Sequence, residues 1–194
     1  MDVSIAGPGY ESPVDARGCY TRCVTANTFC PGCGVVLPPS SWPVSERFHA
    51  SRECWEKYGE LAAYTQSLRD PRFPHQHAVD AYGASHVGPS SKPIMAFFAL
   101  VGLYLACERG LSGRTVQLAH MELGRAKREW PVLVPPRQMG RVTVVDVIAA
   151  PPGEAREVAL MEWARSVWAA WVAQQPRIRE LTAAWLPAIA ATAR

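Results

Sequence analysis

The chain has 194 residues and a formal charge of +3, from 20 basic and 17 acidic residues. So mild an excess gives no electrostatic case for nucleic-acid binding, which needs a concentrated basic face. Its longest apolar segment, residues 93–107, is shorter than the roughly 18 to 20 residues that span a membrane, and the N-terminus lacks the pattern of a signal peptide. We therefore expect a cytoplasmic protein with no membrane segment, in which the six cysteines are thiols or metal ligands and not disulfides.

Residues 1–50 carry glycine and proline at short intervals and show little hydrophobic periodicity. Such a long irregular segment in a compact protein needs something to hold it in place. The sequence Cys30-Pro-Gly-Cys33-Gly, which resembles a zinc knuckle, offers that anchor. We expect residues 1–50 to be an irregular zinc-binding loop module.

Helical patterns follow from residue 51 onward. Ser51 is suited to be the N-cap of the first helix, and Pro71 and Pro74 bound its end. The patterns cover residues 51–70, 75–86, 93–109, 114–130 and 153–175, with a last helix running to about residue 189. The sequence therefore predicts an all-α fold, with a helical bundle over residues 51–194 and the loop module packed on it as one compact domain.

Residues 143–150, TVVDVIAA, are ambiguous. Their valines favour a strand, whereas Thr143 followed by Asp146 is typical of a capped helix. We favour the helix because the chain offers no partner strand.

A Cys-x-x-Cys pair in a cytosolic protein is either half of a metal site or a redox pair. The redox motif belongs near a βαβ pattern, which this sequence lacks, so a metal site is the better interpretation. Cys54 lies in the first turn of its helix, where the helix dipole favours a thiolate, and His75 begins the next helix. We predict zinc, with iron as the other possible metal, bound by Cys30, Cys33, Cys54 and His75.

Other residues compete for these places. Cys19 and Cys23 form a Cys-x3-Cys pair that could substitute, and His49, His77 and His86 are further candidates. The alternative without a metal is that Cys54 is a small buried apolar residue and His75 a surface residue.

A second set of polar residues lies in the predicted helix 75–86. Asp80, Tyr82 and His86 could transfer protons near the metal, and Tyr82 and His86 share a helix face. The structural alternative is that Asp80 makes a salt bridge and His86 ends the helix.

Elsewhere, His120 and the tryptophans 163, 168 and 171 are interpreted as core residues, although the tryptophans could also line a ligand pocket.

Several motifs occur together in order: CPGCGVVLP, CWEKYGELAAY, the set His75, Val79, Asp80, Ala81, Tyr82 and His86, then LACERGLS, VTVVDVIAA and EWARSVWAAW. This order resembles a family of small bacterial proteins with a domain of unknown function, over roughly residues 29–185. The resemblance implies a small, helical, metal-binding protein without an assigned activity. Members of that family carry histidines where this sequence has Ala99, Gln174 and Gln175, which implies an altered pocket here.

The sequence thus leads to a metal-dependent enzyme acting on a small molecule, with Asp80, Tyr82 and His86 handling protons. One alternative is a structural zinc module that binds a ligand or a partner protein without catalysis, since sulfur-rich sites are mostly structural. A weaker alternative is a thiol redox sensor. The sequence makes no prediction of oligomeric state.

Overall fold

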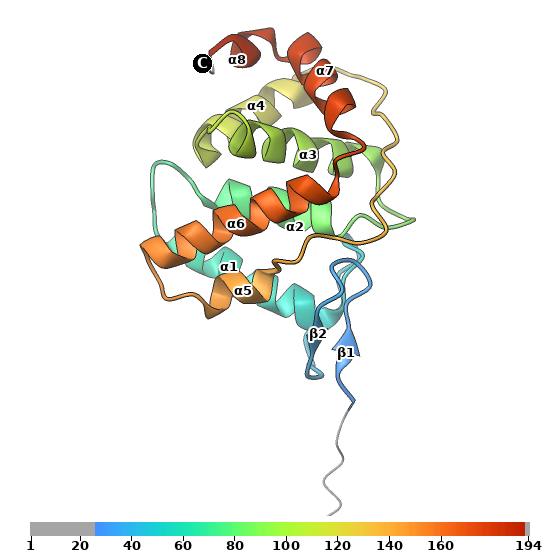
Figure 1. Ribbon diagram of the computed structural model, residues 1–194, viewed down its shortest axis with the longest axis vertical. Helices are drawn as coiled ribbons and strands as arrows, with labels where there is room; N and C mark the ends of the chain where they lie inside the picture. Colours follow the sequence, from blue (N-terminus) through green and yellow to red (C-terminus); the bar gives the residue numbers. More distant parts are fainter. Residues whose placement is uncertain (1–25, 193–194) are drawn as a thin grey trace, which may run out of the picture.

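The computed structural model describes residues 26–192, and in them the chain is mostly helical with one two-stranded sheet (Figure 1). This confirms the predicted all-α class with a cysteine-bearing module near the N-terminus. The strands are β1 (Thr28–Phe29) and β2 (Val36–Leu37). The helices are α1 (Arg52–Ser67), α2 (His75–Ser85), α3 (Pro93–Cys107), α4 (Gly113–Arg125), α5 (Val144–Ala149), α6 (Glu154–Ala170), α7 (Gln175–Trp185) and α8 (Pro187–Thr192).

The two strands form an antiparallel hairpin that projects from one end of the bundle (Figure 1). Its register pairs Thr28 with Leu37 and Phe29 with Val36. The turn closes with the amide of Cys30 donating to the carbonyl of Val35 at 2.8 Å. Gly34 has a φ of +80°, a left-handed conformation that favours glycine, so the Gly after Cys33 permits this tight turn.

Local sequence signals set the ends of the helices. The Ser51 hydroxyl accepts a hydrogen bond from the amide of Cys54 at 3.3 Å, so Ser51 is the N-cap of α1 as predicted. Residues 143–150 contain a short helix, α5, that begins with a capping box of Thr143 and Asp146. The helix was therefore the right choice over a strand at this ambiguous segment.

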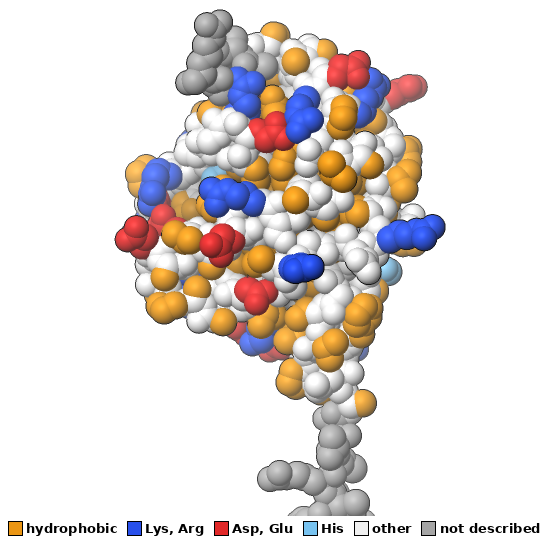
Figure 2. Space-filling model, in the orientation of Figure 1, with side chains coloured by type: hydrophobic (Ala, Val, Ile, Leu, Met, Phe, Trp, Pro, Cys, Tyr) orange, Lys and Arg blue, Asp and Glu red, His pale blue; other side chains and the backbone are white. Residues whose placement is uncertain are grey.

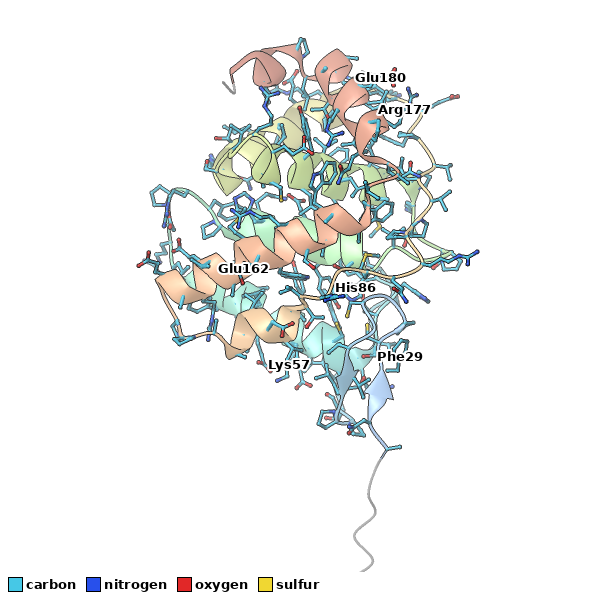
Figure 3. The ribbon with its side chains drawn as sticks, in the orientation of Figure 1. Phe29, Lys57, His86, Glu162, Arg177 and Glu180 are labelled. Carbon is cyan, nitrogen blue, oxygen red and sulfur yellow. The ribbon has the colours of Figure 1, made fainter. Side chains whose placement is uncertain are left out.

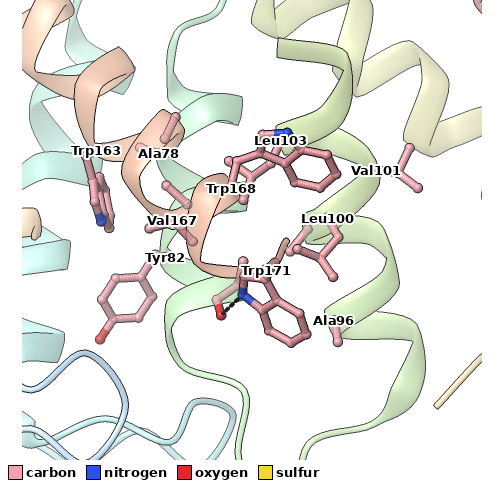
Figure 4. Close-up of a cluster of buried hydrophobic side chains, with 14 of the residues drawn as sticks. Ala78, Tyr82, Ala96, Leu100, Val101, Leu103, Trp163, Val167, Trp168 and Trp171 are labelled. Atoms are coloured by element: carbon pink, nitrogen blue, oxygen red, sulfur yellow. Dashed lines mark hydrogen bonds between the residues drawn. The ribbon is translucent and has the colours of Figure 1, made fainter. Parts of the chain in front are cut away.

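Helices α2, α3 and α6 pack against one another at the centre of the molecule, and the remaining helices lie around them (Figure 1). Trp163 and Trp171 are among the largest fully buried side chains, and Trp168 is also buried (Figure 4). The Trp171 indole N–H donates to the carbonyl of Ala84 at 3.2 Å, which ties α6 to α2. This confirms that the tryptophans of α6 are core residues.

The hairpin and the segment after it expose apolar side chains at the narrow end of the molecule (Figure 2). They are Phe29, Val36, Trp42 and Val44. Within residues 26–192, no helix combines the length and the apolar character that crossing a membrane requires.

Candidate metal centre

Three cysteines and one histidine converge where the hairpin meets the bundle. Cys30 and Cys33 come from the hairpin turn, Cys54 from the first turn of α1, and His86 from the end of α2. Figure 3 shows His86 at this junction, with the hairpin that carries Phe29 below it. The four possible ligand atoms all lie within 4.8 Å of one another, so this Cys3His group could hold a metal ion.

The separations between these atoms suit a tetrahedral ion. With Zn–S bonds of about 2.3 Å, two sulfur ligands at a tetrahedral corner stand about 3.8 Å apart. The Sγ atoms of Cys33 and Cys54 are 3.7 Å apart, and Cys54 Sγ lies 3.3 Å from Nε2 of His86. Binding an ion would therefore bring the two most distant ligand atoms closer together by only about 1 Å.

His86 presents one particular nitrogen to the thiols. Its Nδ1 lies 2.8 Å from the Tyr82 carbonyl oxygen, so the proton sits on Nδ1 and is donated to that carbonyl. Nε2 then faces the cysteines, and once it has lost its proton it can bind a metal. The ring is also stacked on that of Tyr82, with centroids 4.0 Å apart, which fixes its plane.

The turn between the two hairpin cysteines packs closely on the end of α2. A Cβ at Gly32 would stand 2.5 Å from Cδ2 of His86 and 2.5 Å from the carbonyl oxygen of His49. Only glycine allows the turn to approach this closely. Two hydrogen bonds support the junction: the amide of His49 donates to the His86 carbonyl at 3.0 Å, and that of Ser51 donates to Cys30 Sγ at 3.5 Å.

Contacts within the group shift the pKa values of Cys30, Cys54 and His86. Hydrogen bonds with Cys33 and Cys54 lower the pKa of Cys30, while those with Cys30 and Cys33 raise the pKa of Cys54. Burial alone lowers the pKa of His86, but hydrogen bonds with Cys30 and Cys33 outweigh it and raise this pKa to about 9. A divalent cation requires deprotonated ligands, so its binding at this group would be coupled to proton release.

The group is closed to solvent on most sides. Cys30 and Cys54 are 0% exposed and His86 is 1% exposed, and only Cys33 is partly accessible. Four hollows in the described part of the chain are lined by other residues, and none of the four possible ligands lines them. An ion at this centre would have four protein ligands and little space for a substrate.

His75, predicted as the fourth ligand, lies apart from this group, and His86 takes its place. Nδ1 of His75 is 2.8 Å from the Thr65 hydroxyl, and its Nε2 is 3.2 Å from the Gln66 side chain. His75 begins α2 and His86 follows its end, so the helix itself separates them by about 16 Å. The hairpin packs on the C-terminal end of α2.

The residues predicted to handle protons are divided between two places. Tyr82 lies at the metal centre, with its hydroxyl 3.9 Å from Cys54 Sγ, and burial raises its pKa. His86 belongs to the ligand group itself. Asp80 contacts a different set: its Oδ1 accepts from Nε2 of Gln76 at 3.0 Å, and Gln76 Nε2 also lies 3.3 Å from Nδ1 of His120.

The remaining candidates are placed as follows. Cys19 and Cys23 lie outside the described residues. His49 is exposed, and only its backbone meets the centre. His77 is buried in α2 away from the thiols, with no hydrogen-bond partner for Nδ1 among the described residues. Gln76 and His120 were not predicted as partners of Asp80, although the i, i+4 spacing of Gln76 and Asp80 on a helix is a usable signal.

Comparison with curated proteins and with solved structures finds no match. A family of unknown function, DUF5946, matches residues 28–172, which include all four residues of the metal centre. This match covers most of the chain and agrees with the resemblance seen in its motifs. The chain belongs to the family DUF5946.

Proposed function

We propose that this protein is a zinc-binding helical module in which one structural ion, held by Cys30, Cys33, Cys54 and His86, fixes the N-terminal loop module on the bundle. The observation that carries the proposal is the closed Cys3His group at the junction between hairpin, α1 and α2. Thiolate-rich tetrahedral sites suit zinc best among the common divalent ions, and most of them are structural.

The position of the group in the chain supports a structural role. Two of its ligands lie in the hairpin, whose strands are only two residues long, and the other two lie on α1 and at the end of α2, which pack against each other in the bundle. A two-stranded hairpin of this size has little stability of its own. The ion would supply the bonds that hold residues 28–50 in place.

A metal-dependent enzyme, the function that the sequence favours, needs an open coordination position for water or substrate. Four converging protein ligands and the burial of three of them argue for the structural alternative. Tyr82 then acts as packing around the site, and Asp80 belongs to a separate cluster.

The test is metal content by elemental analysis of wild type, His86→Ala and the matched control His75→Ala. We expect one zinc per chain in wild type and His75→Ala, and loss of most of it in His86→Ala. Cobalt loading adds a second measurement, because thiolate ligands give intense absorption bands that report the ligand set. Equal zinc in both variants would exclude His86 as a ligand.

Hydrogen exchange after chelation tests the structural role. Amides of residues 28–50 should lose protection in the zinc-free protein, while those of α3 and α6 should keep it. A chelated protein with an unchanged exchange pattern in residues 28–50 would contradict the proposal.

A further inference from the structure

A cavity of about 340 Å³ lies between α2, α3, α4 and the loop before α1, separate from the metal centre. None of the four metal-centre residues lines it. Its size falls within the range of small-molecule sites. It is lined by apolar residues of α2 and α3, by polar residues on one side, and by Arg47 and Phe48 from the loop.

The polar side of the cavity is made by the cluster of Asp80, Gln76 and His120. Gln76 lies between the other two, and Asp80 Oδ1 is 3.9 Å from Nδ1 of His120. His120 Nε2 lacks a hydrogen bond of normal geometry among the described residues. Asp80 Oδ2 also has no hydrogen-bond partner there, but it packs against Gly102 of α3 outside the cavity lining. Buried polar groups without partners are rare and point to a function.

Burial disfavours the charged form of both titratable groups. Burial raises the pKa of Asp80 well above its ordinary range, and the hydrogen bond from Gln76 opposes this only in part. Burial lowers the pKa of His120 to about 4, although the Phe98 backbone acts in the opposite direction. The deep end of the cavity therefore offers hydrogen-bonding groups in surroundings that disfavour charge, which suit an uncharged polar substituent.

The walls and the opening have different chemistry. Phe48 and Phe98 present aromatic surface to the cavity. Arg47 is exposed, lies over the Phe48 ring with its guanidinium carbon 5.3 Å from the ring centroid, and also lines an adjoining hollow with Lys92 and Glu46. Within residues 26–192 neither Arg47 nor Lys92 takes part in an ion pair, so the opening favours an anion.

We propose that this cavity binds a small aromatic carboxylic acid that carries an uncharged polar substituent. The ring packs against Phe48 and Phe98, and the substituent meets Asp80 and His120. The carboxylate lies at the opening beside Arg47. This inference goes beyond the proposed metal role, and binding is measured independently of zinc content.

Binding is tested by calorimetry on the zinc-loaded, full-length protein. The probes are 4-hydroxybenzoate and indole-3-acetate as acids, 4-hydroxybenzamide as the uncharged analogue and 4-hydroxybenzylamine as the cation. We expect 4-hydroxybenzoate to bind about fivefold more tightly than the amide, the effect of one partly exposed ion pair, and the amine to bind more weakly still. Binding of neither acid, or tighter binding of the amine, would overturn the proposal.

Variants locate the site. Arg47→Gln should abolish the preference for acid over amide, whereas Arg52→Gln, an equal change of charge on an exposed residue of α1, should keep it.

Met95 is half-buried and lines the cavity, so Met95→Trp should fill the opening and weaken binding about tenfold or more. Met121→Trp on the exposed side of α4 should leave it unchanged. Tight binding in a folded Met95→Trp protein, judged by circular dichroism, would place the ligand elsewhere and refute the assignment.

Discussion

At the scale of single residues, Gly32 shows how closely the hairpin turn and α2 depend on each other. Its Cα faces the His86 ring and two backbone carbonyl oxygens, those of His49 and Ser85, at distances that leave no space for a methyl group. These neighbours are the buried ring of a candidate metal ligand and backbone atoms, and moving them aside costs free energy. The absence of a side chain at residue 32 is therefore required for the close packing around the Cys3His group.

We expect Gly32→Ala to push the turn away from His86 and to weaken zinc binding about tenfold or more, the loss typical of a disturbed ligand environment. Competition with a chromogenic chelator measures this affinity. Gly124→Ala is the matched control, because a Cβ there meets nothing within 4 Å and alanine favours the helix. If Gly32→Ala binds zinc as tightly as Gly124→Ala, the close packing has no role in the site.

The sequence indicated part of the ligand group for sound physical reasons. A Cys-x-x-Cys turn with glycines and a cysteine in the first turn of a helix are local features, and the structure brings Cys30, Cys33 and Cys54 together. The choice between His75 and His86 depends on which end of α2 the hairpin packs against. That is a tertiary contact, and no local pattern in the sequence contains it.

At the scale of elements, α5 shows a local signal deciding an ambiguous segment. Its valines favour a strand, but the Thr143 amide donates to Asp146 Oδ2 at 2.7 Å and the Thr143 hydroxyl accepts from the amide of Val145 at 3.3 Å. These bonds satisfy backbone groups that a six-residue helix otherwise leaves unpaired. The buried Val144 and Val147 then pack the helix inward.

Thr143→Ala should lower the free energy of unfolding by about 1 kcal/mol, because the amide of Val145 loses its acceptor. Urea unfolding followed by circular dichroism measures the change. Thr143→Ser keeps the hydroxyl and should retain most of the stability. Equal stability of the alanine and serine variants would mean that the cap contributes nothing.

At the scale of the whole molecule, the predicted all-α class is confirmed because amphipathic periodicity is repeated over many residues. The cavity was not predictable in the same way. Asp80 and His120 lie on different helices, and His120 looked like an ordinary buried histidine until α4 was placed beside α2. A cluster of this kind exists only after the helices pack.

Acid should destabilise the folded protein through His77. Burial lowers the pKa of this histidine from an ordinary value near 6.5 to about 4. The folded state favours neutral His77. The contribution of this histidine to the free energy of unfolding is therefore complete above pH 6.5 and is lost as the pH falls from 6.5 to 4. At pH 5 the loss is about 2 kcal/mol. Urea unfolding at pH 7 and pH 5 should show a smaller difference for His77→Gln than for wild type. An equal decrease in the free energy of unfolding in both proteins would show that His77 does not cause the acid destabilisation.

The metal centre joins parts of the chain that are far apart in sequence. Cys33 and Cys54 are 21 residues apart, and Cys54 and His86 are 32 apart. In the chain-entropy view, a covalent bridge closing a loop of the smaller size removes enough freedom from the unfolded chain to contribute about 3 kcal/mol. An ion at this centre would act as such a cross-link, with its presence governed by metal supply and not by an oxidising environment.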